Sequence, residues 1–167
     1  MDEQRVAIVT GASSGIGEAT CVELARRGYA VVLAARREER LRKVAAACES
    51  AGGRALVVPT DVAEREQVEA LVAAAVEKFD RVDVMVNNAG YGVFARVHEL
   101  SDEQVEGIFA VNFYGVFYGC RAVAPIMMRQ RSGHIFNVSS VIGKRGTPFH
   151  GAYCATKFAV GGLSESM

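Results

Sequence analysis

The chain has 167 residues, half of them hydrophobic and 23% charged, and its 19 basic side chains balance its 19 acidic ones. This length suffices for one domain with a buried core. The neutral charge argues against a nucleic-acid-binding protein, which normally carries a basic excess. The polar first residues, Met1–Arg5, lack the basic and apolar pattern of a secretory signal.

Cysteine and histidine usage points to a reduced, metal-free protein. The four cysteines include no C-x-x-C pair, and they lie in segments with a helical pattern. Free thiols in a cytoplasmic protein fit this distribution better than a disulfide framework. The three histidines are scattered and have no metal-ligand spacing, so we expect no bound metal.

Strand and helix patterns alternate along the chain. The predicted strands are Val6–Val9, Ala30–Ala34, Ala55–Val58, Val82–Val86 and His134–Val138. The predicted helices are Gly15–Arg27, Arg37–Ser50, Glu64–Phe79, Asp102–Arg131 and a last one from Ala152 to the end of the chain. Apolar strands separated by helices imply right-handed crossovers and a parallel sheet. The sequence therefore predicts an α/β fold.

Local signals mark several helix ends. Gly28 and Gly52-Gly53 are predicted to end the first two helices, and Ser101 with Gln104 forms a capping box for the long one. The apolar stretch 107–128 is close to the length of a membrane span. It contains an asparagine, an arginine and a proline, which are costly in lipid, so we expect a buried helix and no membrane partner.

A glycine-rich stretch, Thr10–Gly17, follows the first predicted strand and opens the first predicted helix. Its sequence, T-G-A-S-S-G-I-G, spaces the glycines as G-x-x-x-G-x-G. The N–H groups of such a turn and the positive end of the helix dipole face an anion, and glycine lets the backbone approach it closely. The stretch therefore predicts a site for dinucleotide phosphates. No G-K-[ST] sequence follows, which argues against a P-loop nucleotide hydrolase.

Three further motifs are predicted to share an edge of the sheet with this turn. Tyr153 and Lys157 are four residues apart and so lie on one face of a helix. An ammonium beside a phenol stabilises the phenolate, which suits the tyrosine to act as a general acid or base. Ser140 ends the preceding strand, and Asn87–Gly90 follow another one. Ligands of open α/β sheets bind beyond the carboxyl ends of strands, so these motifs converge on one rim.

The motifs T-G-A-S-S-G-I-G, N-N-A-G, S-S and Y-C-A-T-K resemble, in order and spacing, the classical short-chain dehydrogenases/reductases over essentially the whole chain. The resemblance implies a Rossmann-type doubly wound parallel sheet that ends before the family's last strands, and a single NAD(P)-binding domain over residues 1–167. It implies four catalytic residues: Tyr153 as acid/base, Lys157 as its partner, Ser140 on the substrate oxygen, and Asn112 positioning a water of the proton relay. The positions that match the family's cofactor contacts are Gly11, Ser13, Ser14, Gly15, Ile16, Gly17, Asp61, Val62, Asn88, Ala89, Gly90, Tyr153 and Lys157.

The end of the second strand bears on cofactor choice. NAD-selective folds place Asp or Glu about twenty residues beyond the glycines, where it binds the ribose 2′-hydroxyl. Here the strand is followed by Arg36 and Arg37, and a guanidinium can pair bidentately with a 2′-phosphate. We expect NADP(H) in preference to NAD(H), with Arg36 as the main contact and Arg37 second. The alternative, that both begin a solvated helix face, is stronger for Arg37 than for Arg36.

The resemblance predicts an oxidoreductase that transfers a hydride between NADP(H) and a carbonyl or secondary alcohol. Apolar residues of the two loops near the reacting end favour a small apolar substrate: Val93, Phe94, Val141, Ile142 and Phe149. In this family the long helix packs against a second copy, and here it is apolar on more than one face, which predicts a homodimer or homotetramer. The alternative is a non-catalytic NADP-binding or scaffold protein, because the resemblance ends before the family's substrate-binding part.

Overall fold

The computed structural model describes residues 4–167, which form a five-stranded parallel sheet in the order β3-β2-β1-β4-β5. All five predicted strands are present, with shifts of one or two residues at their ends. The order reverses beside β1, as in a doubly wound sheet, and the predicted Rossmann-type fold is confirmed. The strands are β1 (Val6–Thr10), β2 (Ala30–Ala35), β3 (Arg54–Pro59), β4 (Val84–Asn87) and β5 (His134–Asn137).

The helices also follow the predicted pattern, with one interruption. Residues Ala110–Tyr114 form a π-helical turn inside the long helix that the sequence predicts as continuous. Such turns are rare and frequent at functional sites, and Asn112 lies in this one. The helices are α1 (Gly15–Arg26), α2 (Glu38–Ser50), α3 (Arg65–Phe79), α4 (Asp102–Phe109), α5 (Gly115–Gln130) and α6 (Gly151–Ser166). Short 3-10 turns are η1 (Val97–Glu99) and η3 (Val141–Gly143).

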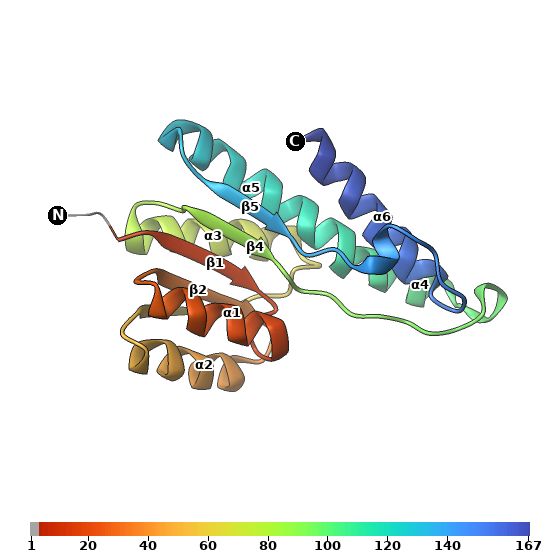
Figure 1. Cartoon of the computed structure of the whole chain (residues 1–167), viewed down its shortest axis with the longest axis horizontal. Helices are drawn as coiled ribbons and strands as arrows, with labels where there is room; N and C mark the ends of the chain where they lie inside the picture. Colours follow the sequence, from red (N-terminus) through yellow and green to blue (C-terminus); the bar gives the residue numbers. More distant parts are fainter. Residues whose placement is uncertain (1–3) are drawn as a thin grey trace.

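Helices cover both faces of the sheet, with α1 and α2 on one side and α3 and α5 on the other (Figure 1). Successive side chains of a strand point to opposite faces. Ala7 of β1 accordingly belongs to the core shared with α1 and α2, whereas Ile8 belongs to the core shared with α3 and α5. A strand covered on both faces reads as a continuous apolar run, which explains why all of β1 is buried.

The predicted helix ends are confirmed where the geometry can be checked. Gly28 and Gly52 have φ of +82° and +91°, the left-handed conformation that glycine adopts after a helix. At the start of α4, Gln104 N donates to Ser101 Oγ (3.3 Å) and Ser101 N donates to Gln104 Oε1 (3.0 Å), which completes the capping box.

The continuous helix from Asp102 to Gln130 is long and apolar enough, by length and composition alone, to cross a membrane. In the structure it is a packed layer of the fold. Val123 of α5 is fully buried in the core shared with α3, and Arg121 donates to Glu69 of α3 at 3.5 Å. Exposed apolar side chains such as Tyr114 remain on its other side.

The four cysteines are buried free thiols. Burial raises the pKa of Cys21, which packs between α1 and the sheet, and also raises the pKa of Cys48 and Cys120. A raised pKa disfavours the thiolate, which is the reactive form. These three thiols therefore have the properties of packing groups.

Candidate active site

The glycine-rich turn joins the carboxyl end of β1 to the amino end of α1. Gly11 and Gly15 have φ of +65° and +60°, a conformation that glycine alone adopts without strain. Ser14 is the N-cap of α1, yet its side chain makes no capping hydrogen bond. The first N–H groups of this twelve-residue helix are therefore left for another acceptor, and an anion is the acceptor that helix N-termini favour.

Close packing also requires that Gly11 and Gly17 have no side chain. A Cβ on Gly17 would collide with the carbonyl oxygen of Gly11 and with the side-chain amide of Asn88. A Cβ on Gly11 would lie 2.8 Å from Asn88 Nδ2 and 2.9 Å from Ala89 Cα. The turn and the segment after β4 can therefore approach each other only because both positions lack a side chain.

Thr10 fastens the segment after β4 to the turn. Its Oγ1 accepts hydrogen bonds from Asn88 N and Ala89 N, both at 3.0 Å, and its carbonyl oxygen accepts from Asn88 Nδ2 at 3.0 Å. Thr10 is 2% exposed. The carboxyl end of β1 is thus joined to the segment after β4 by three part-buried hydrogen bonds.

The two arginines after β2 have different surroundings. Arg37 Nη2 donates to Ser13 Oγ at 2.9 Å and to Ser14 Oγ at 3.1 Å, so its guanidinium lies over the glycine-rich turn. The Arg36 side chain is 75% exposed, and its Nη1 is 4.0 Å from Asp61 Oδ2. An exposed pair at this distance contributes little, so the Arg36 guanidinium can bind an anion. Arg37 does not simply join the solvated helix face that the sequence leaves open as an alternative.

Asn112 is fully buried and connects three segments. Its Oδ1 accepts from Tyr91 N at 3.0 Å, and its Nδ2 donates to Tyr91 O at 2.8 Å and to Thr156 Oγ1 at 3.3 Å. The amide therefore ties the segment after β4 to the π-helical turn and to α6. Because these partners occupy both ends of the amide, its side chain holds backbone in place.

Lys157 and Tyr153 lie on α6 next to the carboxyl ends of β4 and β5. Lys157 is 4% exposed, and its Nζ donates to the carbonyl oxygen of Val138 at 2.7 Å. Burial lowers the pKa of this ammonium. Its Nζ lies 5.7 Å from the centre of the Tyr153 ring. The positive charge is therefore close to the phenol.

The two serines that follow β5, Ser139 and Ser140, differ in their hydrogen bonding. Ser139 Oγ donates to the carbonyl oxygen of Lys157 at 3.2 Å, which binds this serine to α6. Ser140 lines a cavity with Tyr153, and within residues 4–167 neither hydroxyl has a hydrogen-bond partner. Both hydroxyls are therefore available to a ligand oxygen.

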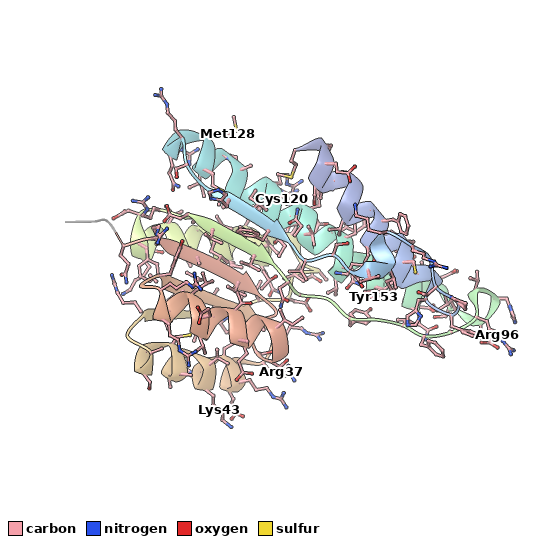
Figure 2. All side chains as sticks on the ribbon, viewed as in Figure 1. Arg37, Lys43, Arg96, Cys120, Met128 and Tyr153 are labelled. Atoms are coloured by element: carbon pink, nitrogen blue, oxygen red, sulfur yellow. The ribbon has the colours of Figure 1, made fainter. Side chains whose placement is uncertain are left out.

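A cavity of about 650 Å³ runs along the carboxyl ends of the strands and brings most of the predicted residues together. Arg37 and Tyr153 lie at this same end of the sheet (Figure 2). Three of the predicted catalytic and cofactor residues do not line the cavity: Gly15 and Gly17, which shape the turn, and Asn112, which lies behind Tyr91. The apolar residues predicted on the substrate side do not line it either: Val93, Phe94, Val141, Ile142 and Phe149. The predicted residues that line it are Gly11, Ser13, Ser14, Ile16, Arg36, Arg37, Asp61, Val62, Asn88, Ala89, Gly90, Ser140, Tyr153 and Lys157.

The cavity suits a dinucleotide. Its volume falls in the range of small-molecule and cofactor sites, about 300–1,000 Å³. A Cβ on Gly90 would lie 3.1 Å from Asn112 Oδ1 and 3.7 Å from Lys157 Nζ, so the missing side chain leaves room beside the ammonium. Uncapped N–H groups, two guanidinium groups and this bare backbone match the phosphates and ribose of such a ligand.

Sequence reasoning missed several residues that hold the site. Thr10, Tyr91 and Thr156 take part through hydrogen bonds to Asn88, Ala89 and Asn112. Thr10 and Thr156 stand inside the quoted motifs, so their position was a usable signal. The sequence gave no such signal for Tyr91, because its backbone N and O, and not its side chain, bind Asn112.

Comparison with known proteins agrees with this geometry. A family model described as short chain dehydrogenase matches residues 5–167. The chain is 42% identical over 163 residues to an uncharacterized oxidoreductase of Listeria innocua and 41% identical over 166 residues to a 3beta-hydroxysteroid dehydrogenase of Mediterraneibacter gnavus. These alignments cover 98% and 99% of this chain but 66% and 60% of the relatives. The chain thus spans less than two thirds of their length.

Solved structures are similar over the whole described fold. A metagenomic short-chain oxidoreductase in complex with NADP superposes with a TM-score of 0.94 at 38% identity, covering 97% of this chain and 74% of that one. A short chain dehydrogenase/reductase from Burkholderia phymatum in complex with NAD superposes with a TM-score of 0.95 at 40% identity, covering 99% of this chain and 60% of that one. Similar proteins therefore bind either nicotinamide cofactor.

Proposed function

The chain belongs to the short-chain dehydrogenases, and from that membership we propose that it is an NADP(H)-dependent oxidoreductase acting on a carbonyl or secondary alcohol. Residues 1–167 are its single dinucleotide-binding domain. One observation carries the proposal. The same cavity holds a phosphate-type turn with Arg36 on its β2 side and the trio Ser140, Tyr153 and Lys157 on its β5 side.

Tyr153, Ser140 and Lys157 have separate roles in the proposed reaction. A bound nicotinamide would supply or accept the hydride. Tyr153 gives its hydroxyl proton to the substrate oxygen in reduction and takes it back in oxidation. Ser140 donates a hydrogen bond to the same oxygen and holds it at the phenol. The Lys157 ammonium, 5.7 Å from the phenol ring, stabilises the phenolate that remains.

Lys157 and Asn112 complete the proton path. Burial lowers the pKa of Lys157, so its ammonium releases a proton more readily than a solvated lysine does. The hydrogen bond to the Val138 carbonyl fixes the direction of Nζ. Asn112 has its amide bound to Tyr91 and Thr156. A relay water at Asn112 would therefore be held by the main-chain carbonyl of the π-helical turn.

The proposed cofactor is NADP(H) in preference to NAD(H). The tip of β2 ends at Ala35 and carries no carboxylate for a ribose 2′-hydroxyl. Arg36 has the freer guanidinium and is the main 2′-phosphate contact. Arg37, already bound to Ser13 and Ser14, is the second and brings their hydroxyls to the same anion.

Arg36→Ala is expected to weaken NADPH affinity by about 10- to 100-fold, because a charge-assisted hydrogen bond is worth about 1.5–3 kcal/mol. NADH affinity should stay within about twofold, since NADH has no 2′-phosphate. Arg37→Ala should show the same selectivity to a smaller degree. The measurement is titration of each variant with both cofactors. Arg40→Ala, an exposed arginine one turn along α2, is the control and should change neither affinity. Equal losses for NADPH and NADH would contradict the assignment.

The proposal extends to substrate, assembly and location. The substrate is a small carbonyl or alcohol with apolar groups, and neither nucleic acid nor a membrane is a partner. The expected partner is a second copy, in a homodimer or homotetramer, because the π-helical turn and the start of α5 present a row of rings. Phe113 stacks on Phe117, Tyr114 stacks on Tyr118, and Tyr114 is 48% exposed. The protein is proposed to be cytoplasmic.

The decisive assay is oxidation of NADPH by the purified protein with a panel of apolar ketones. Turnover of at least one ketone, and a slower rate with NADH, is the expected result. Binding of NADPH without turnover of any ketone would favour a non-catalytic binding protein. Failure to bind either cofactor would refute the proposed function.

A further inference from the structure

Three consecutive residues at the carboxyl end of β5 each bind α6. Asn137 Nδ2 donates to Ser164 Oγ at 3.0 Å, and Ser139 Oγ donates to the Lys157 carbonyl oxygen at 3.2 Å. Between them, the Val138 carbonyl oxygen accepts from Lys157 Nζ at 2.7 Å. The end of β5 therefore runs along α6 in the direction opposite to the helix. It binds Lys157 both at its side chain and at its main chain.

These hydrogen bonds lie on the helix face that carries the phenol. Lys157 and Ser164 are seven residues apart on α6, about two helical turns, so they lie on one face. Tyr153, four residues before Lys157, continues this face toward the amino end of the helix. Ser140 follows the three residues directly and lines the cavity with Tyr153. The bonds from residues 137–139 therefore fix where the phenol lies relative to Ser140.

Apolar packing does less to fix this position. The core cluster between α5 and α6 contains Val116, Cys120 and Val160, and α6 also packs against η3, the π-helical turn and α4 at the end of the sheet (Figure 1). Apolar contacts are non-directional, so they permit small shifts of a helix along or about its axis. Hydrogen bonds depend on distance and angle, and they therefore determine the position of α6 more sharply.

Gly143 covers the hydrogen bond of Ser139. A Cβ on Gly143 would lie 2.5 Å from Ser139 Oγ and 2.9 Å from the Lys157 carbonyl oxygen. Gly143 is itself buried in η3. Its bare backbone therefore lies against both partners of the bond, and water has little room to replace the serine hydroxyl.

We infer that Ser139 is a positioning residue, which holds Lys157 on α6 where its ammonium acts on the Tyr153 phenol. The inference rests on the proposed function. Without the Ser139 hydroxyl, Lys157 keeps only the bond from Nζ to Val138, and the helix that carries it is free to shift. Nζ lies 5.7 Å from the centre of the phenol ring. Because the attraction between two charges falls with distance, a shift that lengthens this distance makes the phenolate form less readily.

Lys157 is the cation that acts on this phenol. The titratable groups on the segments and helices around Lys157 are Tyr91, Asp102, Glu103, Glu106, Tyr114 and Lys144. Lys144 pairs with Glu165 at 3.5 Å. Burial is the one cause that lowers the pKa of Lys157, so none of these groups governs its charge. The position of Nζ is therefore the quantity that Ser139 controls.

The test is the pH dependence of alcohol oxidation, in which Tyr153 takes a proton and must first be a phenolate. Ser139→Ala should move the low-pH limb of kcat/KM to higher pH by about half a unit to one unit. One unit is a tenfold change in the balance of phenol and phenolate, and a hydrogen bond of this kind contributes no more than about that. Ser139→Thr keeps the hydroxyl and should restore the wild-type limb.

Ser50→Ala is the matched control. Ser50 Oγ donates to the Ala46 carbonyl oxygen of α2 at 2.8 Å, so this variant also removes a bond from a serine to a helix carbonyl, but away from the cavity. It should leave the limb unchanged.

A second measurement needs neither substrate nor cofactor. The ultraviolet absorbance of tyrosinate is titrated with pH in wild type and Ser139→Ala, each with and without Tyr153→Phe, and the difference reports the ionisation of Tyr153. Ser139→Ala should again require a higher pH. If both measurements stay at the wild-type pH, the inference is wrong and Ser139 only joins two segments, even if the melting temperature falls. A shifted titration without turnover of any alcohol or ketone would support the hold of Ser139 on Lys157 and refute the proposed function.

Discussion

Tyr153→Phe is expected to lower kcat of NADPH-dependent ketone reduction by about 10²- to 10⁴-fold, the contribution typical of a general acid. The variant loses the only group in the proposal that can give a proton to the substrate oxygen. The hydroxyl has no hydrogen-bond partner within residues 4–167, so its removal leaves no buried group unsatisfied. NADPH affinity and the melting temperature should therefore stay close to those of the wild type. Steady-state kinetics, cofactor titration and a thermal melt measure the three quantities.

Tyr29→Phe is the control for this substitution. Tyr29 lies beside β2, at the end of the sheet away from the cavity, where its ring faces Arg5 at 4.5 Å. The control should retain wild-type kcat. A Tyr153→Phe protein that keeps most of its activity would refute the acid/base assignment, whatever its stability.

Gly11→Ala should lower the free energy of unfolding by about 2–5 kcal/mol and abolish NADPH binding. A left-handed backbone costs a residue with a Cβ about 1–2 kcal/mol, and overpacking adds about 1–3 kcal/mol. The new Cβ would lie 2.9 Å from the backbone of Ala89 and 2.8 Å from the Asn88 amide, and backbone cannot move aside cheaply. Denaturant unfolding and cofactor titration test the two effects.

Gly15→Ala separates the two causes. Gly15 has nearly the same φ, +60°, but no atom lies within 4 Å of the position of its Cβ. Gly15→Ala should therefore lower the free energy of unfolding only by the cost of the left-handed backbone, about 1–2 kcal/mol. Equal losses for the two substitutions would show that close packing between the turn and Asn88-Ala89 does not matter.

Much of the fold could be predicted from local sequence. The strand runs and the helical periodicity gave all five strands, because burial on both faces demands continuous apolar residues. The long helix was predicted over nearly its observed length, but the π-helical turn at Ala110–Tyr114 inside it was not predicted. The π-helical turn contains Asn112, whose partners Tyr91 and Thr156 lie 21 and 44 residues away. No periodicity within the helix could report those contacts.

The candidate site was likewise predictable where it depends on local sequence and not where it depends on contacts between distant residues. The cavity gathers Arg36, Ser140, Tyr153 and Lys157 as their positions at strand ends and on one helix face predict. The hydrogen bonds from Arg37 to Ser13 and Ser14 were not predictable, because they join the end of β2 to the turn after β1. The sequence predicts Arg37 as the second 2′-phosphate contact but leaves a solvated helix face open as an alternative, since its neighbours in the chain are charged.

The α/β class, the order of elements, the phosphate-type turn and the residue types at the rim can all be derived from local sequence. These follow from hydrophobic periodicity and from the backbone freedom of glycine, which are properties of neighbouring residues. Only the tertiary structure decided that the amide of Asn112 holds the segment after β4, that Lys157 Nζ is fixed by the Val138 carbonyl, and that Ser139 binds the Lys157 carbonyl. Each of these depends on how strand ends and loops distant in the chain are packed together, and that packing is set by the whole sheet and the helices that cover it.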